Sequence, residues 1–295
     1  MASAFRRKDE RVVMEIRNIA VLGAGTMGHG IAHAAIAGGY QTRLYDVNDA
    51  AVAKGSAAIE AIVRKGVDLG KTTGSDAEAM LRRLITTSSP GEALQDADFV
   101  IEAAPEKIDL KLALFAQIEQ LAPASAVIAS NTSALSITEM AGALKAPTRV
   151  AGMHFFNPVH RMKLVEIVQA LESSAETIAT IEAVARAMGK ETVLVRESPG
   201  FITTRVNASI GNEAFYMLME GVASARDIDK ALKLGLNHPM GPFELVDLVG
   251  LDTRLSILEY LHRSLGEKYR PCPLLAQYVK AGRLGRKVGR GVYEY

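Results

Sequence analysis

Short apolar runs alternate with longer amphipathic runs between residues 17 and 198. The short runs have the length and composition of buried strands, and the longer runs space their apolar residues three and four apart, as helices do. The predicted strands are Ile19–Leu22, Thr42–Tyr45, Leu84–Thr87, Phe99–Glu102, Ala126–Ser130, Val150–Phe155, Leu164–Val168 and Thr192–Val195. The predicted helices are Gly28–Gly38, Asp49–Gly66, Asp76–Arg83, Leu110–Leu121, Ser136–Leu144 and Ala175–Met188. This alternation predicts βαβ units and an α/β fold with a mostly parallel sheet.

The pattern changes near Ser198-Pro199-Gly200, and only helical periodicity follows. Helices are predicted over Phe201–Glu220, after the capping sequence Ser224–Asp227, over Phe243–Leu248 with Pro242 in the first turn, and over Asp252–Leu265. We therefore expect a doubly wound Rossmann domain over 16–198 and an all-helical domain over 199–295. Residues 1–15 are predicted to be a flexible, charged extension.

The composition excludes several classes of protein. Lys and Arg total 34 and Asp and Glu total 33, so a net charge of +1 gives no general attraction to nucleic acid or to an anionic membrane. A single cysteine, Cys272, excludes an intrachain disulfide and a cysteine-based zinc site. No run approaches the roughly 18 apolar residues that span a bilayer, and no signal peptide is recognisable. We expect a cytoplasmic protein with no nucleic-acid or membrane partner.

A glycine loop joins the first predicted strand to the first predicted helix, with the sequence Gly23-Ala-Gly25-Thr26-Met27-Gly28. In a dinucleotide-binding loop the first glycine permits the turn, the second lets a pyrophosphate approach the backbone, and the third lets helix and strand pack closely. Asp46 follows the next strand, where a carboxylate can bind ribose hydroxyls and repel a 2′-phosphate, which favours NAD over NADP. The alternative is a glycine-rich turn in an ordinary βαβ unit, with Asp46 capping the next turn.

A histidine and a glutamate lie on two predicted strands joined by a turn. If the chain reverses near His160, His154 and Glu166 face each other across a hairpin. A carboxylate beside an imidazole stabilises its cation and orients the ring, so His154 can exchange a proton with an alcohol that loses hydride. The alternatives are a structural salt bridge and a catalytic role for His160.

Polar residues follow the fifth predicted strand, in the segment Ser130-Asn131-Thr132-Ser133. Ligands of open α/β sheets bind at this edge, so these side chains can contact a substrate oxygen. The alternative is a turn that caps the helix at Ser136. His29 and His33 lie four residues apart on the first helix, but no third ligand is indicated, so no metal site is predicted.

Six motifs in order resemble the L-3-hydroxyacyl-CoA dehydrogenase family, and within it the short, single-function 3-hydroxybutyryl-CoA dehydrogenases. The resemblance extends from about Arg17 to Tyr295. It is carried by Gly23–Gly28, Ser130–Ser133, His154-Phe-Phe-Asn-Pro158, Pro199-Gly-Phe-Ile-Thr-Thr-Arg205, His238-Pro-Met-Gly-Pro-Phe-Glu-Leu245 and Leu284-Gly-Arg-Lys-Val-Gly-Arg-Gly291.

The resemblance implies NAD-dependent, reversible oxidation of an (S)-3-hydroxyacyl-CoA to the 3-oxoacyl-CoA. His154 is then the catalytic acid/base and Glu166 its partner, with Ser133 and Asn157 at the substrate's 3-oxygen. The expected cofactor-binding residues are Gly23, Gly25, Thr26, Met27, Gly28, Asp46, Glu106, Lys111 and Asn131, with Glu106 and Lys111 near the nicotinamide.

The resemblance also assigns the helical segment 50–83, with Lys54, Arg64, Lys65 and Lys71, to the CoA nucleotide, although interleaved acidic residues also fit a solvated helix face. Lys54 and Lys65 are expected to bind substrate. The helical domain is expected to form a homodimer and to close over the active site.

One position departs from the family pattern. Thr204 stands where the family has Asn before Arg205, a position that orients the thioester end of the substrate. The first alternative function is therefore the same chemistry on a free 3-hydroxy acid of the sugar-acid or carnitine type. The second is a non-catalytic NAD-binding structural or sensing protein.

Overall fold

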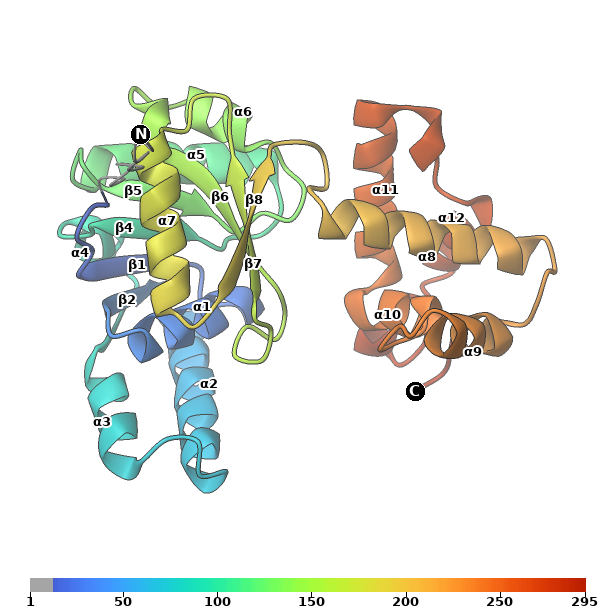
Figure 1. Cartoon of the computed structure of the whole chain (residues 1–295), viewed down its shortest axis with the longest axis horizontal. Helices are drawn as coiled ribbons and strands as arrows, with labels where there is room; N and C mark the ends of the chain where they lie inside the picture. Colours follow the sequence, from blue (N-terminus) through green and yellow to red (C-terminus); the bar gives the residue numbers. More distant parts are fainter. Residues whose placement is uncertain (1–12) are drawn as a thin grey trace, which may run out of the picture. The chain divides into compact units, whose positions relative to one another are not determined.

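The computed structural model describes residues 13–295, which divide into two compact units (Figure 1). The first unit ends at Glu197 and the second runs from Ser198 to Tyr295. In the described part of the chain, no helix is long and apolar enough to cross a membrane.

The first unit is built on an eight-stranded sheet in the order β3-β2-β1-β4-β5-β6-β7-β8. All neighbouring strands are parallel except β6 and β7, which run antiparallel. The strands are β1 Asn18–Leu22, β2 Gln41–Tyr45, β3 Leu84–Thr87, β4 Phe99–Glu102, β5 Val127–Ser130, β6 Val150–Phe155, β7 Leu164–Gln169 and β8 Glu191–Arg196. This confirms the predicted doubly wound, mostly parallel sheet.

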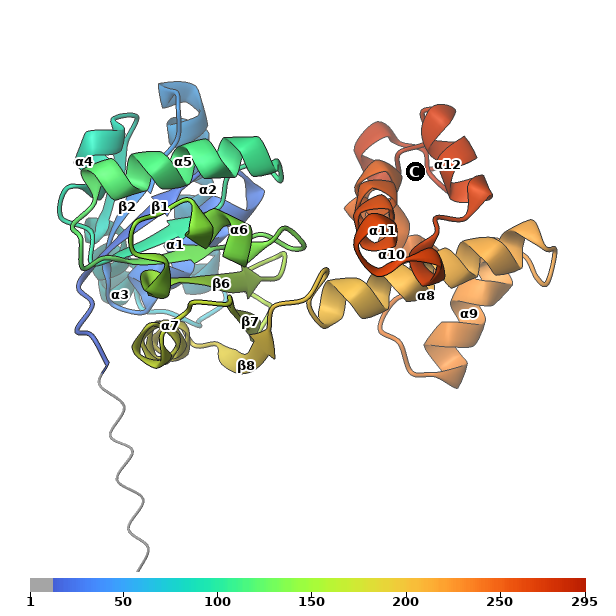
Figure 2. The ribbon, with the colours of Figure 1, turned by 90° about the horizontal axis from the view of Figure 1, so that it is seen from above.

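Helices cover both faces of this sheet, as Figure 2 shows for α5 and α7. Alternate strand residues face the two layers, because successive side chains of a strand point in opposite directions. Ile19, Val21, Phe99 and Ile101 therefore join one core cluster with α1, α2 and α7. The helices are α1 Thr26–Ala37, α2 Asp49–Asp68, α3 Gly74–Arg82, α4 Pro90–Leu94, α5 Ile108–Leu121, α6 Ile137–Gly142 and α7 Ala175–Ala187.

The second unit is helical, as the sequence predicts. Its helices are α8 Thr203–Met219, α9 Ala225–Gly235, α10 Pro242–Val249, α11 Leu251–Leu265 and α12 Pro273–Lys280. Ser224 caps α9 by accepting a hydrogen bond from the Asp227 amide, at 3.2 Å, as predicted. Buried Asp247 accepts from the amides of Val292 and Tyr293, which fixes the C-terminal segment against the helices.

Two short helices were not predicted. One is α4, which has five residues and begins with Pro90 after the cap Ser89, and the other is α12, which begins with Pro273. Residues 1–12 of the predicted extension lie outside the described residues. Met14 differs from the loose segment expected there, because it packs against the core and its amide donates to Thr180 Oγ1 at 3.2 Å.

Gly28 allows α1 to pack closely against the loop that follows β1. A Cβ at this position would lie 1.6 Å from the carbonyl oxygen of Gly23, so backbone would have to move. We expect Gly28→Ala to lower the free energy of unfolding by about 1–3 kcal/mol or more, measured by thermal and urea unfolding. Gly142→Ala in α6 is the matched control, because nothing lies within 4 Å of the added Cβ. Equal stability of the two variants would contradict the packing argument.

Candidate active site

His154 and Glu166 lie directly opposite each other on the antiparallel strands β6 and β7. His154 Nδ1 lies 2.7 Å from Glu166 Oε2, a hydrogen-bonding distance at which the ring nitrogen donates to the carboxylate. The His154 side chain is 5% exposed and the Glu166 side chain 0%. The predicted register is therefore confirmed. A buried, carboxylate-oriented imidazole can act as a general acid and base.

Neighbouring groups fix the strand that carries His154. The Phe155 amide donates to Asn131 Oδ1 at 2.9 Å, which joins the end of β6 to the loop after β5. The Phe156 ring contacts the His154 ring, with centroids 4.5 Å apart. Asn157, the next predicted substrate residue, is exposed in the turn that follows.

The glycine loop has the geometry that dinucleotide binding requires. Gly23 has φ +108°, a backbone conformation that glycine adopts readily and other residues rarely adopt. A Cβ at this position would also lie 2.7 Å from the Ala103 carbonyl oxygen. Nothing lies within 4 Å of a Cβ built on Gly25, so the space beside its backbone is open. Gly25 is also the N-cap of α1, whose first amides can bind an anion.

A cavity of about 910 Å³ opens beside this loop. Its lining includes Gly25, Thr26, Met27, Asp46 and the apolar residues Leu110 and Leu114 of α5. Asp46 Oδ2 accepts from the Ala24 amide at 2.7 Å, and Oδ1 accepts from the Val47 amide at 2.8 Å. Asp46 therefore supports the glycine loop through Ala24, binds the amide of the residue that follows it, and also lines the cavity. A dinucleotide fits this site: open backbone at Gly25, a helix N-terminus, and a carboxylate at the ribose position.

Ser133 lies in a loop that a second carboxylate orders. Glu106 Oε1 accepts from Thr132 Oγ1 at 2.5 Å and from the Ser133 amide at 2.8 Å. Thr132 was predicted only as a member of the polar segment Ser130–Ser133, since a threonine in a turn carries no distinctive signal of its own. Glu106, expected near the nicotinamide, therefore joins the loop after β4 to the loop with Ser133.

Lys111 lies in a buried ion pair. Its Nζ lies 2.6 Å from Glu102 Oε1, and the two side chains are 1% and 0% exposed. Glu102 was not predicted as a site residue. Its only distinctive feature in the sequence is that it is an acid at the end of a run of apolar residues. A direct contact between Lys111 and the cofactor remains a prediction.

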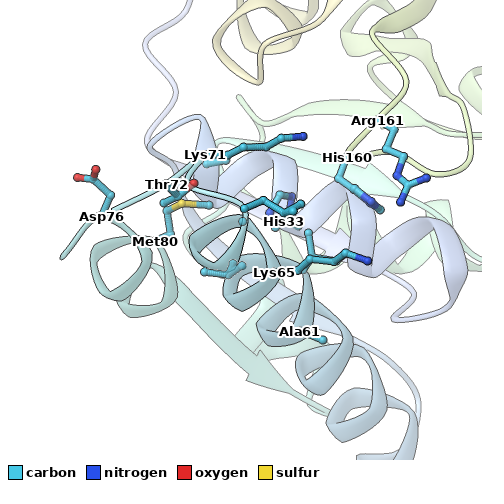
Figure 3. A pocket seen from close by; sticks show the side chains of 14 residues that line it. His33, Ala61, Lys65, Lys71, Thr72, Asp76, Met80, His160 and Arg161 are labelled. Atoms are coloured by element: carbon cyan, nitrogen blue, oxygen red, sulfur yellow. The ribbon is translucent and has the colours of Figure 1, made fainter. Parts of the chain in front are cut away.

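A second cavity of about 960 Å³ is lined by basic residues from different parts of the first unit (Figure 3). His33 comes from α1, Lys65 from α2, Lys71 from the turn before α3, and His160 and Arg161 from the β6–β7 turn. Asp76 also lines it. Lys65, Lys71 and Arg161 therefore bring positive charge from distant parts of the chain to one cavity.

Not all predicted basic residues reach this cavity. Lys54 is exposed and does not line it, and Arg64 Nε binds Glu60 at 3.0 Å. Thr204 is half-buried in the first turn of α8, in the second unit. Among residues 13–295 there is no group of three or more His, Cys, Asp or Glu that could hold a metal ion.

The fold and the glycine loop define the class: a Rossmann-type dinucleotide-binding protein with a buried His154–Glu166 pair across the strands β6 and β7. β6 runs parallel to β5, so His154 lies toward the same sheet edge as the glycine loop.

Comparison with known proteins identifies the family. Residues 18–198 match the 3-hydroxyacyl-CoA dehydrogenase NAD binding domain, and residues 200–295 match the 3-hydroxyacyl-CoA dehydrogenase C-terminal domain. The chain belongs to the 3-hydroxyacyl-CoA dehydrogenase family, whose NAD binding domain it contains.

Similar proteins include a probable 3-hydroxybutyryl-CoA dehydrogenase of Bacillus subtilis (strain 168), 47% identical over 96% of this chain and 98% of the relative. The 3-hydroxyadipyl-CoA dehydrogenase of Escherichia coli (strain K12) is 41% identical over 96% of this chain and 60% of that protein. The crystal structure of (S)-3-hydroxybutyryl-CoA dehydrogenase from Ralstonia eutropha has a TM-score of 0.92 and 44% identity, covering 95% of this chain and 99% of that chain.

His33 predicts a dependence of stability on pH. Burial lowers the pKa of His33 from 6.5 to about 4, with smaller electrostatic contributions from His160, Lys190 and His29. The unfolded chain therefore binds a proton between these values that the folded chain does not, so stability falls as pH drops from 6.5 toward 4. We expect His33→Gln to flatten this part of the curve of Tm against pH. Parallel curves for the two proteins would contradict this.

Proposed function

We propose that this protein catalyses the reversible, NAD-dependent oxidation of a short-chain (S)-3-hydroxyacyl-CoA, such as 3-hydroxybutyryl-CoA, to the 3-oxoacyl-CoA. One observation carries the proposal: the buried His154–Glu166 pair, at 2.7 Å, on the sheet whose glycine loop suits a dinucleotide. The names of the Bacillus and Ralstonia relatives support this substrate class.

The proton chemistry follows from the two ring nitrogens of His154. Nδ1 is committed to Glu166, so the alcohol proton passes to Nε2 during oxidation. The imidazolium that forms is stabilised by the buried carboxylate, because the interaction is strong away from water. In the reverse direction Nε2 returns the proton to the 3-oxygen. Ser133 and Asn157 stabilise that oxygen as it gains negative charge.

The cofactor would lie on Gly23, Gly25, Thr26, Met27 and Gly28, with Asp46 at the adenosine ribose. Bound NAD supplies the acceptor for the hydride that leaves the substrate carbon. The Asp46 carboxylate repels the 2′-phosphate of NADP, so we expect NADH to be preferred over NADPH.

The basic cavity supports a CoA thioester over a free hydroxy acid. Lys65, Lys71 and Arg161 line it, and a CoA nucleotide carries phosphates that these cations can bind. Thr204 is shorter than the family's Asn but retains a donor and an acceptor, and the thioester end of the substrate is the part it would orient. The Escherichia coli relative, named for 3-hydroxyadipyl-CoA, makes a dicarboxylic acyl chain a second substrate to assay.

We further propose a cytoplasmic homodimer formed through the helical unit. Apolar side chains exposed near both ends of α8 support this, since a second copy of the chain can cover them. Ile202, Val206 and Met219 are each more than two-fifths exposed. Size-exclusion chromatography with light scattering tests the dimer.

His154→Gln and Glu166→Gln test the catalytic pair. Removal of the acid/base should lower kcat for acetoacetyl-CoA reduction by about 10²–10⁴-fold, with NADH binding retained. Glu166→Gln removes the charge that stabilises the imidazolium and should lower kcat by a smaller factor. NADH absorbance gives the rate and fluorescence titration the affinity. A His154→Gln enzyme with a tenth of normal turnover would falsify the assignment.

Lys65→Met and Lys71→Met test the CoA cavity. Loss of a phosphate contact should raise the KM for acetoacetyl-CoA about 5- to 50-fold for each substitution, with the KM for NADH unchanged. Lys145→Met, an exposed lysine outside the cavity, is the control. If free 3-hydroxybutyrate is a good substrate and CoA does not compete, the free-acid alternative replaces the proposal. If neither the thioester nor the free acid is turned over, the non-catalytic alternative replaces the proposal.

A further inference from the structure

Glu102 is a fully buried carboxylate at the end of β4, and its two oxygens hold two different loops. Oε1 accepts from Lys111 Nζ at 2.6 Å and from the Ala104 amide at 2.7 Å. Oε2 accepts from Ser130 Oγ at 2.5 Å. One oxygen therefore serves the loop after β4, beside the dinucleotide cavity, and the other serves the end of β5.

Lys111 holds this carboxylate in place. Its Nζ also donates to the Ala104 carbonyl at 3.2 Å and lies 3.5 Å from Glu106 Oε2. A buried ion pair of this kind is a poor source of stability, because desolvation of the two charges offsets their attraction. Its geometry is the more specific contribution, since two charged groups with several hydrogen bonds tolerate little displacement.

The contacts continue from Ser130 to Ser133. Ser130 Oγ accepts from the Thr132 amide at 3.2 Å. Glu106, on the other loop, accepts from Thr132 Oγ1 and from the Ser133 amide. The loop after β4 and the loop after β5 are thus joined twice, once through Glu102 and once through Glu106. Lys111 contacts both glutamates.

We propose that Glu102, Lys111 and Ser130 form a positioning unit that fixes the substrate-side loop of Ser133 relative to the cofactor-side loop 103–106. The inference rests on the proposed function, because it gives Ser133 its task at the substrate oxygen. A displaced Ser133 loop should slow turnover while the glycine loop and Asp46 still bind NADH. The unit acts through Ser133 and touches no reacting atom itself.

Ser130→Ala tests this unit, and Ser173→Ala is its matched control. Both serines are buried, and each donates one hydrogen bond and accepts one: Ser173 Oγ donates to the Val150 carbonyl at 2.5 Å and accepts from the Ala170 amide at 2.9 Å. Ser173 lies near the start of β6, away from Ser133. The two substitutions should therefore cost similar stability, which Tm measures.

We expect Ser130→Ala to lower kcat for acetoacetyl-CoA about 10- to 100-fold below Ser173→Ala, with the NADH Kd changed less than about twofold in both. Glu102→Gln should also lower kcat. The double variant Glu102→Gln/Ser130→Ala should be no slower than the slower single variant, because the charge-assisted hydrogen bond from Ser130 to Glu102 is absent from all three.

Three results would overturn the proposal: equal kcat in Ser130→Ala and Ser173→Ala, losses in kcat that multiply in the double variant, or weaker NADH binding with kcat intact. Failure of the proposed function looks different, because the wild type and Ser173→Ala would then also be inactive with acetoacetyl-CoA.

Discussion

The antiparallel pairing of β6 and β7 is the constraint on which the site depends. Every other neighbouring pair in the sheet is parallel, and a parallel partner for β6 would require a long crossover. The short turn between Phe155 and Leu164 instead returns the chain beside itself, so His154 faces Glu166. β5 and β8 flank this hairpin, so it lies inside the sheet rather than at its edge. Both side chains are buried, which strengthens their interaction.

The register of that hairpin could be predicted because it depends on local sequence alone. Two apolar strands with a polar turn allow few pairings, and a shift by one residue would bury the wrong faces. The glycine loop was predictable for the same reason, because the turn and the close packing that require its three glycines lie within six residues of the chain. The helices α4 and α12, which were not predicted, are short and begin with proline. Proline is common at the start of both turns and helices, so it does not distinguish the two.

Contacts between distant segments could not be predicted. Glu102 and Lys111 lie on a strand end and a helix, and nothing in their spacing distinguishes an ion pair from two unrelated charges. The helix α2 gives a second example of a site that could not be fully predicted from the sequence. Lys54 and Lys65 share a helix face, but eleven residues separate them by roughly 16 Å along the axis, so one lines the basic cavity and the other does not. The turn that supplies His160 and Arg161 decides where this cavity lies.

The two buried glutamates of the sheet carry different partners, and the difference matches their tasks. Near neutral pH lysine is a permanent cation, whereas imidazole gains and loses a proton. The Glu102–Lys111 pair takes no part in the proposed proton transfer, and its several hydrogen bonds suit it to serve as a fixed support. In the proposed reaction the imidazole of the Glu166–His154 pair takes up and releases a proton, so the net charge of that pair changes. A buried change of charge is costly unless the surroundings are already oriented for it, so a rigid loop beside the changing pair lowers the reorganisation that each proton transfer requires.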